Sequence, residues 1–188
     1  MILTDLPMNF DTKTDTTLRI IQIAAVEAGG GLGFRGRIPW DCPADRQFFR
    51  RQTQGHIVVL GRVTYESLGR PSLPGRRIVV LSSCCPHGLM PVSGEGICMP
   101  VSWSQKIERV FEIAAKTDAV IYIGGGARVY AGTMAFADEL ILSRMHGHYT
   151  CDRFYPALPK TMQLVERYAM DGFDVYRYVC RGNGRAFG

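Results

Sequence analysis

Short runs of β-branched and apolar residues alternate along this chain with amphipathic segments, and glycines stand at several of the junctions. This alternation is typical of an α/β domain whose strands are largely parallel. After residue 137 no strong helical pattern returns, so the sheet is expected to finish with antiparallel strands. We therefore predict a single α/β domain with a central, mostly parallel eight-stranded sheet, an antiparallel C-terminal end and about four flanking helices.

The spacing of these elements fits one domain. Strands are expected over residues 18–26, 56–60, 77–82, 97–101, 119–123, 138–145, 162–169 and 174–180, and helices over 43–53, 62–68, 104–117 and 127–135. With 188 residues the chain is long enough to bury a core. We expect this domain to span 18–180, between a loosely ordered N-terminal extension (1–17) and a flexible tail (181–188), because Gly, Thr and charged residues offer little to bury.

Composition limits the classes of protein to which the chain can belong. The longest apolar runs, such as 78–81, are far shorter than the ~20 residues of a membrane span. The first 17 residues lack the basic start and apolar stretch of an export signal. Six cysteines without a C-x-x-C pair indicate reduced thiols. We therefore expect a cytoplasmic protein without membrane contact, and a monomer.

The net charge of +5 comes mainly from arginines that are scattered among apolar runs. No nucleic-acid motif accompanies them, so small polyanionic ligands explain the charge better than nucleic acid does. His146, His148 and Cys151 offer three metal ligands where structural zinc normally takes four. We expect no metal site.

Residues 37–45 bring a proline, an indole and a carboxylate into one loop-to-helix entry. Pro43 suits the first helical position, which puts Asp45 in the first turn, where the helix dipole favours a negative charge. Phe49 follows one turn later on the same face. An acid between Trp40 and Phe49 is suited to holding a flat, cationic or proton-accepting ring. The alternative is an acid that only stabilises its own helix.

Glycine turns carry the second set of candidates. Segments 61–64 and 124–128 are strand-to-helix turns with an arginine, which suits a ligand with several phosphates, although tight structural turns remain the alternative. Segment 31–36 matches G-x-G-x-x-G, but the following 38–40 blocks the helix that a dinucleotide fingerprint needs, so we interpret it as a mobile glycine loop. Arginines in the turn 70–77 are placed to grip a carboxylate, or serve only solubility.

Together these motifs resemble dihydrofolate reductase from about residue 18 to 180. The matching segments are Ile23-Ala24-Ala25, Leu32-Gly33, Pro39-Trp40 to Pro43-Ala44-Asp45, Gly61-Arg62 to Thr64-Tyr65-Glu66-Ser67, Gly69-Arg70-Pro71, Leu73-Pro74-Gly75-Arg76, Leu81-Ser82-Ser83, and Gly125-Gly126 to Val129-Tyr130. Any one of them can arise by chance, but eight in this order are highly specific.

The resemblance implies reduction of 7,8-dihydrofolate to 5,6,7,8-tetrahydrofolate by NADPH, with hydride transfer to C6 and protonation of N5. It implies that Asp45 is the ionisable catalytic group of the pterin pocket and that Trp40 orders water beside it. Residues implied to bind the substrate are Ile23, Asp45, Phe49, Leu68 and Ser143, with Arg76 and Arg70 on the glutamate tail. Residues implied to bind NADPH are Ala25, Leu32, Gly33, Arg37, Ile38, Arg62, Val63, Thr64, Leu81, Ser82, Ser83, Gly125, Gly126, Ala127, Arg128, Val129 and Tyr130. A cis peptide bond between the paired glycines is implied as well.

Three positions depart from the family pattern. Arg46 stands where an apolar residue usually covers the substrate, Gly124 replaces an aliphatic residue, and Arg153 replaces a small hydroxyl residue. Gly124 leaves a roomier pocket beside the nicotinamide. We hypothesise that these changes weaken antifolate inhibitors such as trimethoprim more than they weaken dihydrofolate, because a drug that fills the pocket depends on close packing. The expected partners are thus dihydrofolate and antifolates.

Two other functions compete with this one. A reductase of the same fold that acts on a ribosylated pyrimidine in riboflavin biosynthesis would keep the glycine turns and Thr64. It gives no reason for Trp40 and Asp45 at this spacing. A non-catalytic basic binding module would bind nucleic acid tightly and salt-dependently without oxidising NADPH.

Overall fold

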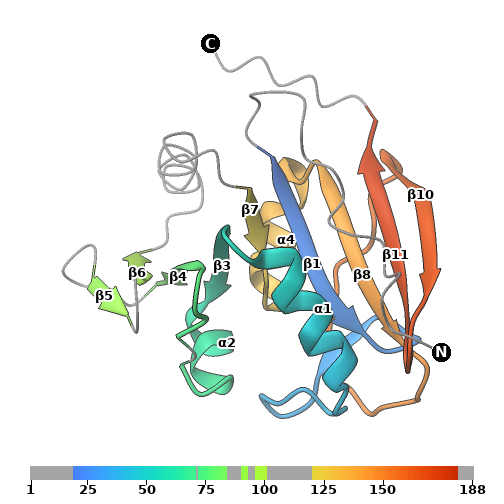
Figure 1. The fold of residues 1–188 in the computed structure, drawn as a ribbon, viewed down its shortest axis with the longest axis horizontal. Coiled ribbons are helices and arrows are strands. Elements are labelled where there is room, and N and C mark those ends of the chain that lie inside the picture. The colour runs from blue at the N-terminus through green and yellow to red at the C-terminus, as the bar shows by residue number, and fades with distance from the viewer. Residues whose placement is uncertain (1–18, 71, 84–89, 93–95, 101–119, 182–188) are drawn as a thin grey trace.

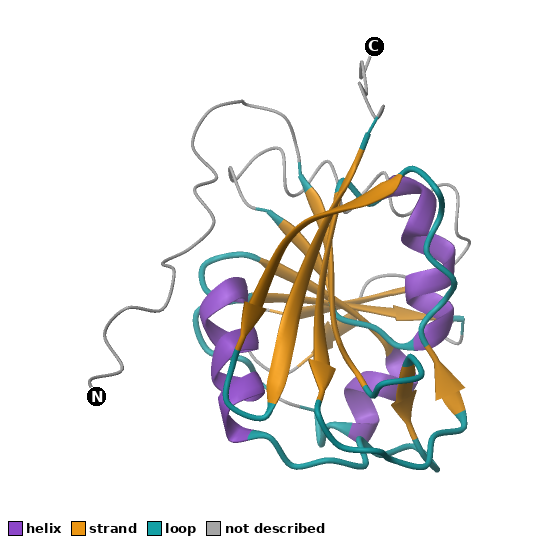
Figure 2. Ribbon diagram, turned by 90° about the vertical axis from the view of Figure 1, so that its right-hand side faces the viewer, coloured by secondary structure: helices purple, strands orange, loops and turns teal. Residues whose placement is uncertain are grey.

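The computed structural model describes residues 19–70, 72–83, 90–92, 96–100 and 120–181, with 90–92 and 96–100 as backbone only. The expected extension 1–17, the expected helix over 104–117 and all but the first residue of the expected tail 181–188 lie outside the described residues. Within the described part, a twisted sheet forms the centre of the domain, and helices lie on both sides of it (Figures 1 and 2).

The main sheet has nine strands in the order β10-β11-β8-β1-β7-β3-β4-β6-β5. Their bounds are β1 Ile20–Val26, β3 Ile57–Gly61, β4 Arg77–Ser82, β5 Met90–Val92, β6 Gly96–Pro100, β7 Ile121–Ile123, β8 Glu139–Met145, β10 Met162–Ala169 and β11 Phe173–Cys180. All eight predicted strands are present. The ninth, β5, was missed because a three-residue Met-Pro-Val segment carries no alternation that marks a strand.

Strand directions confirm the predicted mixture. Parallel pairs join β8 to β1, β1 to β7, β7 to β3, β3 to β4 and β4 to β6. Antiparallel pairs join β8 to β11 and β11 to β10 at the C-terminal end, and β6 to β5 at the other edge. Two further short strands, β2 Gly31–Gly33 and β9 Arg153–Phe154, pair with each other in a separate small sheet.

The helices begin where the sequence places proline or glycine. They are α1 Pro43–Thr53, α2 Arg62–Ser67 and α4 Ala127–Thr133, and the 3-10 turn Met134–Phe136 follows α4 directly. Pro43 opens α1, while Gly61 and Gly126 are the N-cap residues of α2 and α4. The predicted spans 43–53, 62–68 and 127–135 are therefore confirmed to within about two residues.

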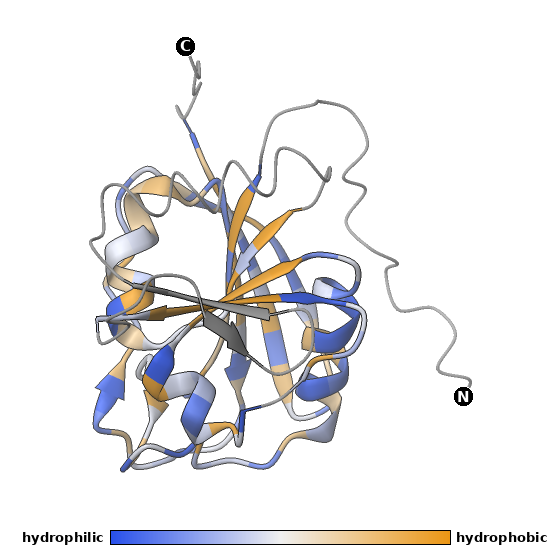
Figure 3. Cartoon of the chain, turned by 90° about the vertical axis from the view of Figure 1, so that its left-hand side faces the viewer, coloured by the Kyte–Doolittle hydropathy of each residue, from blue (hydrophilic) through white to orange (hydrophobic). Residues whose placement is uncertain are grey.

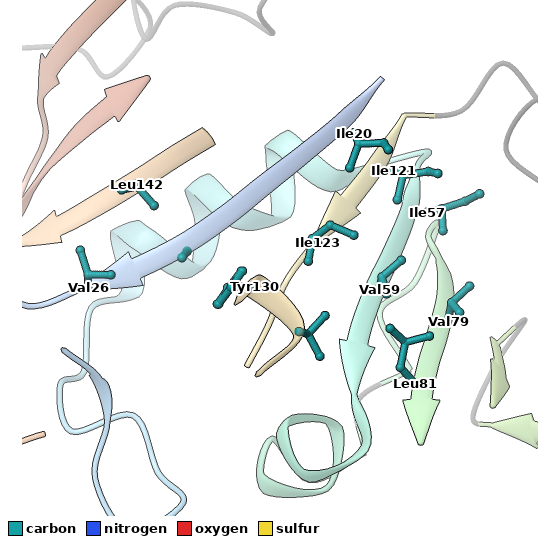
Figure 4. Packing of buried hydrophobic residues seen from close by; sticks show 12 residues of the cluster. Ile20, Val26, Ile57, Val59, Val79, Leu81, Ile121, Ile123, Tyr130 and Leu142 are labelled. Atoms are coloured by element: carbon teal, nitrogen blue, oxygen red, sulfur yellow. The ribbon is translucent and has the colours of Figure 1, made fainter. Parts of the chain in front are cut away.

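The two faces of the sheet carry separate hydrophobic clusters. On one face, Val129 and Tyr130 of α4 pack against β-branched and leucine side chains of the central strands (Figure 4). On the other face, Phe48 of α1 packs with Trp40 and Phe173, and Tyr65 of α2 packs on β3 and β4. Hydrophobic strands in the middle and polar outer surfaces give the expected layered pattern (Figure 3).

A buried amide fastens α4 to the sheet. Gln22 of β1 has no exposed surface, and its Nε2 donates to the Tyr130 carbonyl at 2.9 Å and to Thr133 Oγ1 at 2.8 Å. The Tyr155 hydroxyl donates to its Oε1. Because this amide is removed from water, these groups of α4 and Tyr155 satisfy its hydrogen-bonding capacity and join β1 to α4.

We predict that Gln22→Leu lowers the free energy of unfolding by about 2–4 kcal/mol, because it leaves buried donors and acceptors unpaired. Urea denaturation measures this loss. The control is Gln163→Leu, at a half-exposed position of β10, which should change stability by no more than about 0.5 kcal/mol. Equal effects of the two substitutions would show that the amide does not fasten α4.

Candidate active site

The C-terminal ends of the parallel strands meet at one edge of the sheet, and this edge carries most of the predicted site residues. In the register, Gly61 of β3 lies beside Leu81 of β4, and Val59 lies beside Ile123 of β7. Ala25 of β1 lies beside Ser143 of β8. Ligands of open α/β sheets bind outside the carboxyl ends of the strands. We call this end of the sheet, formed by the C-terminal ends of β1, β3, β4, β7 and β8, the site edge.

Asp45 lies half-buried in the first turn of α1, behind the N-cap Cys42 and Pro43. Burial raises the pKa of its carboxyl group, while a hydrogen bond with the Ser143 side chain and the charge of Arg46 act in the opposite direction. Desolvation is the largest of these effects. The proton affinity of Asp45 is therefore set mainly by its burial, in the first turn of α1 where the sequence predicts this acid.

Apolar and aromatic side chains pack between α1, which carries this acid, and the sheet. Ile23 and Trp40 are buried in the cluster between α1 and the sheet, and Phe49 packs against its margin. The Tyr130 hydroxyl donates to the Ile23 carbonyl at 2.8 Å. Burial raises the pKa of Tyr130 most, and the negative charges of ionised Tyr155 and Asp45 raise it further, so α4 also reaches the neighbourhood of the acid.

The paired glycines lie where α2 and α4 begin. The bond between Gly125 and Gly126 is cis, as the resemblance implies. The Gly61 N–H donates to the Gly125 carbonyl at 2.6 Å. A Cβ on Gly126 would lie 2.7 Å from Thr64 Oγ1, and one on Gly61 would lie 2.9 Å from Val129 Cγ2. Side chains are therefore excluded at this junction, and the two helix starts approach each other closely.

The residues predicted to bind a dinucleotide fall into two groups. Side chains of the first group are buried in or against the core, and their positions are set by packing: Leu32, Leu81, Ser82, Val129 and Tyr130. Those of the second group lie at the surface of the same edge: Arg37, Ile38, Val63, Ser83 and Arg128 are exposed, and Ala25, Gly33, Arg62, Thr64, Gly126 and Ala127 are partly exposed. Arg62 also pairs with Glu66 within α2, at 2.8 Å.

Arg76 is a buried cation at the far end of α1. Its NH1 donates to Thr53 Oγ1 at 3.2 Å, and its Nε has no hydrogen-bond partner among the described residues. Burial and the nearby Arg50 lower the pKa of Arg76. A guanidinium with no described carboxylate beside it is poised for an anionic ligand.

The predicted helper Arg70 follows α2. Its side chain is 70% exposed and its NH2 lies 3.9 Å from Glu66. Leu68, predicted to line the substrate site, is 46% exposed on the same stretch. Arg50 is exposed, and its charge lowers the pKa of Arg76.

The predicted mobile glycine loop is partly a strand. Gly31 and Gly33 form β2 and pair with Phe154 and Arg153 of β9. The Asp152 N–H donates to the Gly33 carbonyl at 2.9 Å, and Asp152 Oδ2 accepts from the Arg35 N–H at 3.1 Å. No local signal predicts this pairing, because β9 has two residues and lies over 100 positions away in the sequence.

Among the described residues, the side chains of histidine, cysteine, aspartate and glutamate form no group of three or more that could hold a metal ion. His146 instead lies 3.2 Å from Asp174. Cys42, Cys151 and Cys180 are free thiols. No described helix is long and apolar enough to cross a membrane.

Comparison with known proteins points to one family. Residues 19–181 match the family model for dihydrofolate reductase. Dihydrofolate reductase type A13 of Escherichia coli is 36% identical over 142 residues, covering 76% of this chain and 80% of the relative. The dihydrofolate reductase of Bacillus subtilis is 33% identical over 134 residues, covering 71% and 73%. The structure of the Enterococcus faecalis dihydrofolate reductase complexed with NADP(H) and RAB-propyl superposes with a TM-score of 0.73 at 26% identity, covering 87% of this chain and 96% of that one.

Proposed function

This chain belongs to the dihydrofolate reductase family, and we propose that it binds its ligands along the site edge, with Asp45 as the catalytic acid group. It is an NADPH-dependent oxidoreductase that reduces 7,8-dihydrofolate to 5,6,7,8-tetrahydrofolate. The single observation that supports the role of Asp45 is its environment: a half-buried carboxylate, hydrogen-bonded to Ser143, whose pKa burial raises.

Asp45 holds the pterin ring and fixes its orientation. A carboxylate accepts paired hydrogen bonds from an amino group and an adjacent ring N–H, which orients a flat ring for transfer. Because burial raises its pKa, Asp45 also favours the protonation that must reach N5. Trp40 lies buried at the entry to the same helix and orders water beside the acid.

The residues at the glycine junction fit NADPH. The absence of Cβ atoms at Gly125 and Gly126 allows close backbone approach, and the starts of α2 and α4 place Arg62 and Arg128 at the same edge. NADPH supplies the hydride when it is bound. Thr64, Ser82 and the two arginines offer donors to its phosphates.

The glutamate tail extends along α1 toward Arg76. Asp45 and Thr53 are separated by eight positions of α1, which is about 12 Å along a helix axis. Thr53 Oγ1 accepts from Arg76, so the helix carries the pterin contact at its start and the tail contact at its end. Arg50, rather than Arg70, is the second cation near the tail.

The two rival functions receive no support. Family membership and the NADP(H)-bound relative favour reduction of dihydrofolate over a ribosylated pyrimidine and over nucleic-acid binding. We also propose that the enzyme acts as a cytoplasmic monomer. Free thiols at Cys42, Cys151 and Cys180 support a reducing compartment.

We predict that Asp45→Asn lowers kcat at neutral pH by about 10²-fold or more, because an amide cannot exchange the proton. The loss should shrink at acidic pH, where dihydrofolate arrives protonated. Since burial raises the pKa of Asp45, the unfolded chain loses this proton first as pH rises, and stability falls across that interval. The substitution should therefore keep or raise the Tm. NADPH oxidation followed across pH and a thermal melt measure both effects.

Asp41→Asn is the control for Asp45→Asn, because Asp41 precedes the same helix but its side chain is 80% exposed. It should leave kcat within about twofold, as expected for a solvated ion pair. If Asp45→Asn stays within a few-fold of the parent at neutral pH, the acid has been assigned wrongly.

We predict that Arg76→Ala raises KM for dihydrofolate about 10-fold to 100-fold with little change in kcat, because the tail contact is the same in ground and transition states. Steady-state kinetics with dihydrofolate and with a dihydropterin lacking glutamate measure this effect, and only the former should respond. Arg77→Ala, at the exposed neighbouring position, should leave both KM values unchanged. A KM for the tail-less substrate that rises equally would contradict the tail contact.

We propose that Arg46 makes the enzyme tolerant of antifolates. Its side chain is 63% exposed and pairs with Asp41, so a cation stands where the family places an apolar cover. Gly124 adds less room than the sequence suggests, because a Cβ there would lie 2.9 Å from Leu60 Cδ2. Arg153 lies at the exposed edge of β9, and its NH1 donates to the Asp152 carbonyl.

Arg46→Leu should lower the inhibition constant for trimethoprim about tenfold while KM for dihydrofolate changes less, because an apolar side chain restores close packing against the drug. Asp41→Ala removes the ion pair but keeps the cation and should leave inhibition unchanged. An inhibition constant for the parent enzyme equal to that of a drug-sensitive relative would rule out this tolerance.

A further inference from the structure

Glu27 is a buried acid outside the substrate site. It follows the last residue of β1, Val26, and only 8% of its surface is exposed. Its Oε1 accepts the Gly29 N–H at 2.7 Å and the Gly31 N–H at 3.1 Å. The Glu27 main chain closes the same turn, because its N–H donates to the Gly31 carbonyl and its carbonyl accepts from Gly30, both at 2.9 Å.

The electrostatics of this turn favour the ionised form of Glu27. The hydrogen bond from Gly29 lowers its pKa most, burial opposes this, and the Gly31 N–H, His148 and Arg144 lower it further. The hydrogen bonds that two backbone amides donate to one charged oxygen are stronger than hydrogen bonds to a neutral acceptor. The glycines of this turn lose much conformational freedom when the chain folds. A fixed hydrogen-bond acceptor therefore contributes more to ordering this turn than it would in a rigid loop.

Side-chain packing supports the turn on one side only. On that side, a Cβ on Gly31 would lie 2.5 Å from the Cys151 side chain and 2.9 Å from Glu27 Cγ. On the other side lies a hollow of about 220 Å³, lined by Glu27, Gly30, Arg144 and Tyr176 among others. The hollow faces the α4 side of the sheet, away from Asp45. The hydrogen bonds to Glu27 therefore hold the turn in place, together with one from the Arg144 guanidinium to the Ala28 carbonyl and one from the Tyr155 N–H to the Gly30 carbonyl at 2.8 Å.

The turn leads directly to residues at the site edge. Gly31 starts β2, Leu32 packs against the α4-side cluster, and the Gly33 carbonyl accepts from Asp152. The segment is therefore held at one end by the Glu27 carboxylate, directly after β1, and at the other by β9. Loss of the Glu27 carboxylate should therefore displace Leu32 and Gly33. Asp45 of α1 is not part of this segment.

We propose that Glu27 is a positioning residue for NADPH, which acts by holding Leu32 and Gly33 in their places against the bound cofactor. This inference rests on the cofactor contacts proposed above for Leu32 and Gly33. Glu27 affects the affinity for NADPH and does not contact the pterin. The effect of replacing Glu27 can therefore be distinguished from the effect of replacing Asp45.

The test compares Glu27→Ala, Glu27→Gln and Asp138→Ala. Asp138 is a matched control, because its Oδ2 accepts the Ile20 N–H at 2.8 Å at the opposite end of the same strand. The Kd for NADPH is measured by fluorescence titration without substrate, KM for dihydrofolate by steady-state kinetics, and Tm by thermal melting. All binding is measured well below the lowest Tm.

Glu27→Ala should raise the Kd for NADPH about tenfold or more, with KM for dihydrofolate within about twofold, because two charge-assisted hydrogen bonds are lost. Glu27→Gln keeps an acceptor oxygen and should recover most of the affinity. Asp138→Ala should lower the Tm without changing the Kd. A Kd that is unchanged in Glu27→Ala, or raised equally in Asp138→Ala, would overturn the proposal. Failure of the parent enzyme to oxidise NADPH with dihydrofolate would instead contradict the function itself.

Discussion

Parallel pairing of the central strands determines where the functional side chains of this enzyme lie. Because β8, β1, β7, β3 and β4 all run in one direction, their C-terminal ends deliver side chains and turns to the same edge. Ser143 comes from one end of this series and Ser82 from the other. A register shift of one residue in any strand would turn its side chains to the opposite face and dismantle the site.

Two groups at opposite ends of α1, Asp45 and Arg76, carry charge in surroundings that disfavour it. Burial raises the pKa of Asp45 and lowers that of Arg76, so each opposes folding to some extent. In the proposed binding mode, the substrate offers ring N–H donors to the acid and a carboxylate to the guanidinium. The residues that oppose folding of the free enzyme are thus the ones that we propose to bind dihydrofolate, as is common at active sites. Glu27, by contrast, is satisfied by backbone amides in the free enzyme, which suits a structural anchor.

Much of this architecture follows from the sequence. Pro43 and the glycines at 61 and 126 predict where three helices begin, because proline and glycine impose their own backbone preferences. The motif around Asp45 predicts its place in the first turn of α1. Helical periodicity shows which face of α1 Arg50 occupies, but the sequence does not show that its charge acts on Arg76. It also missed β2 and β9, which are too short to show a period.

By itself, the sequence determined the order of the elements, the turn chemistry and the identities of the groups available for catalysis, because these depend on residues close together in the chain. Tertiary structure alone decided which groups meet. Asp45 reaches Ser143 across 98 positions, and Gly33 reaches Asp152 across 119. Such contacts depend on strand register and on burial. Burial in turn shifts the pKa of an acid or leaves a cation without a partner. No local pattern encodes them.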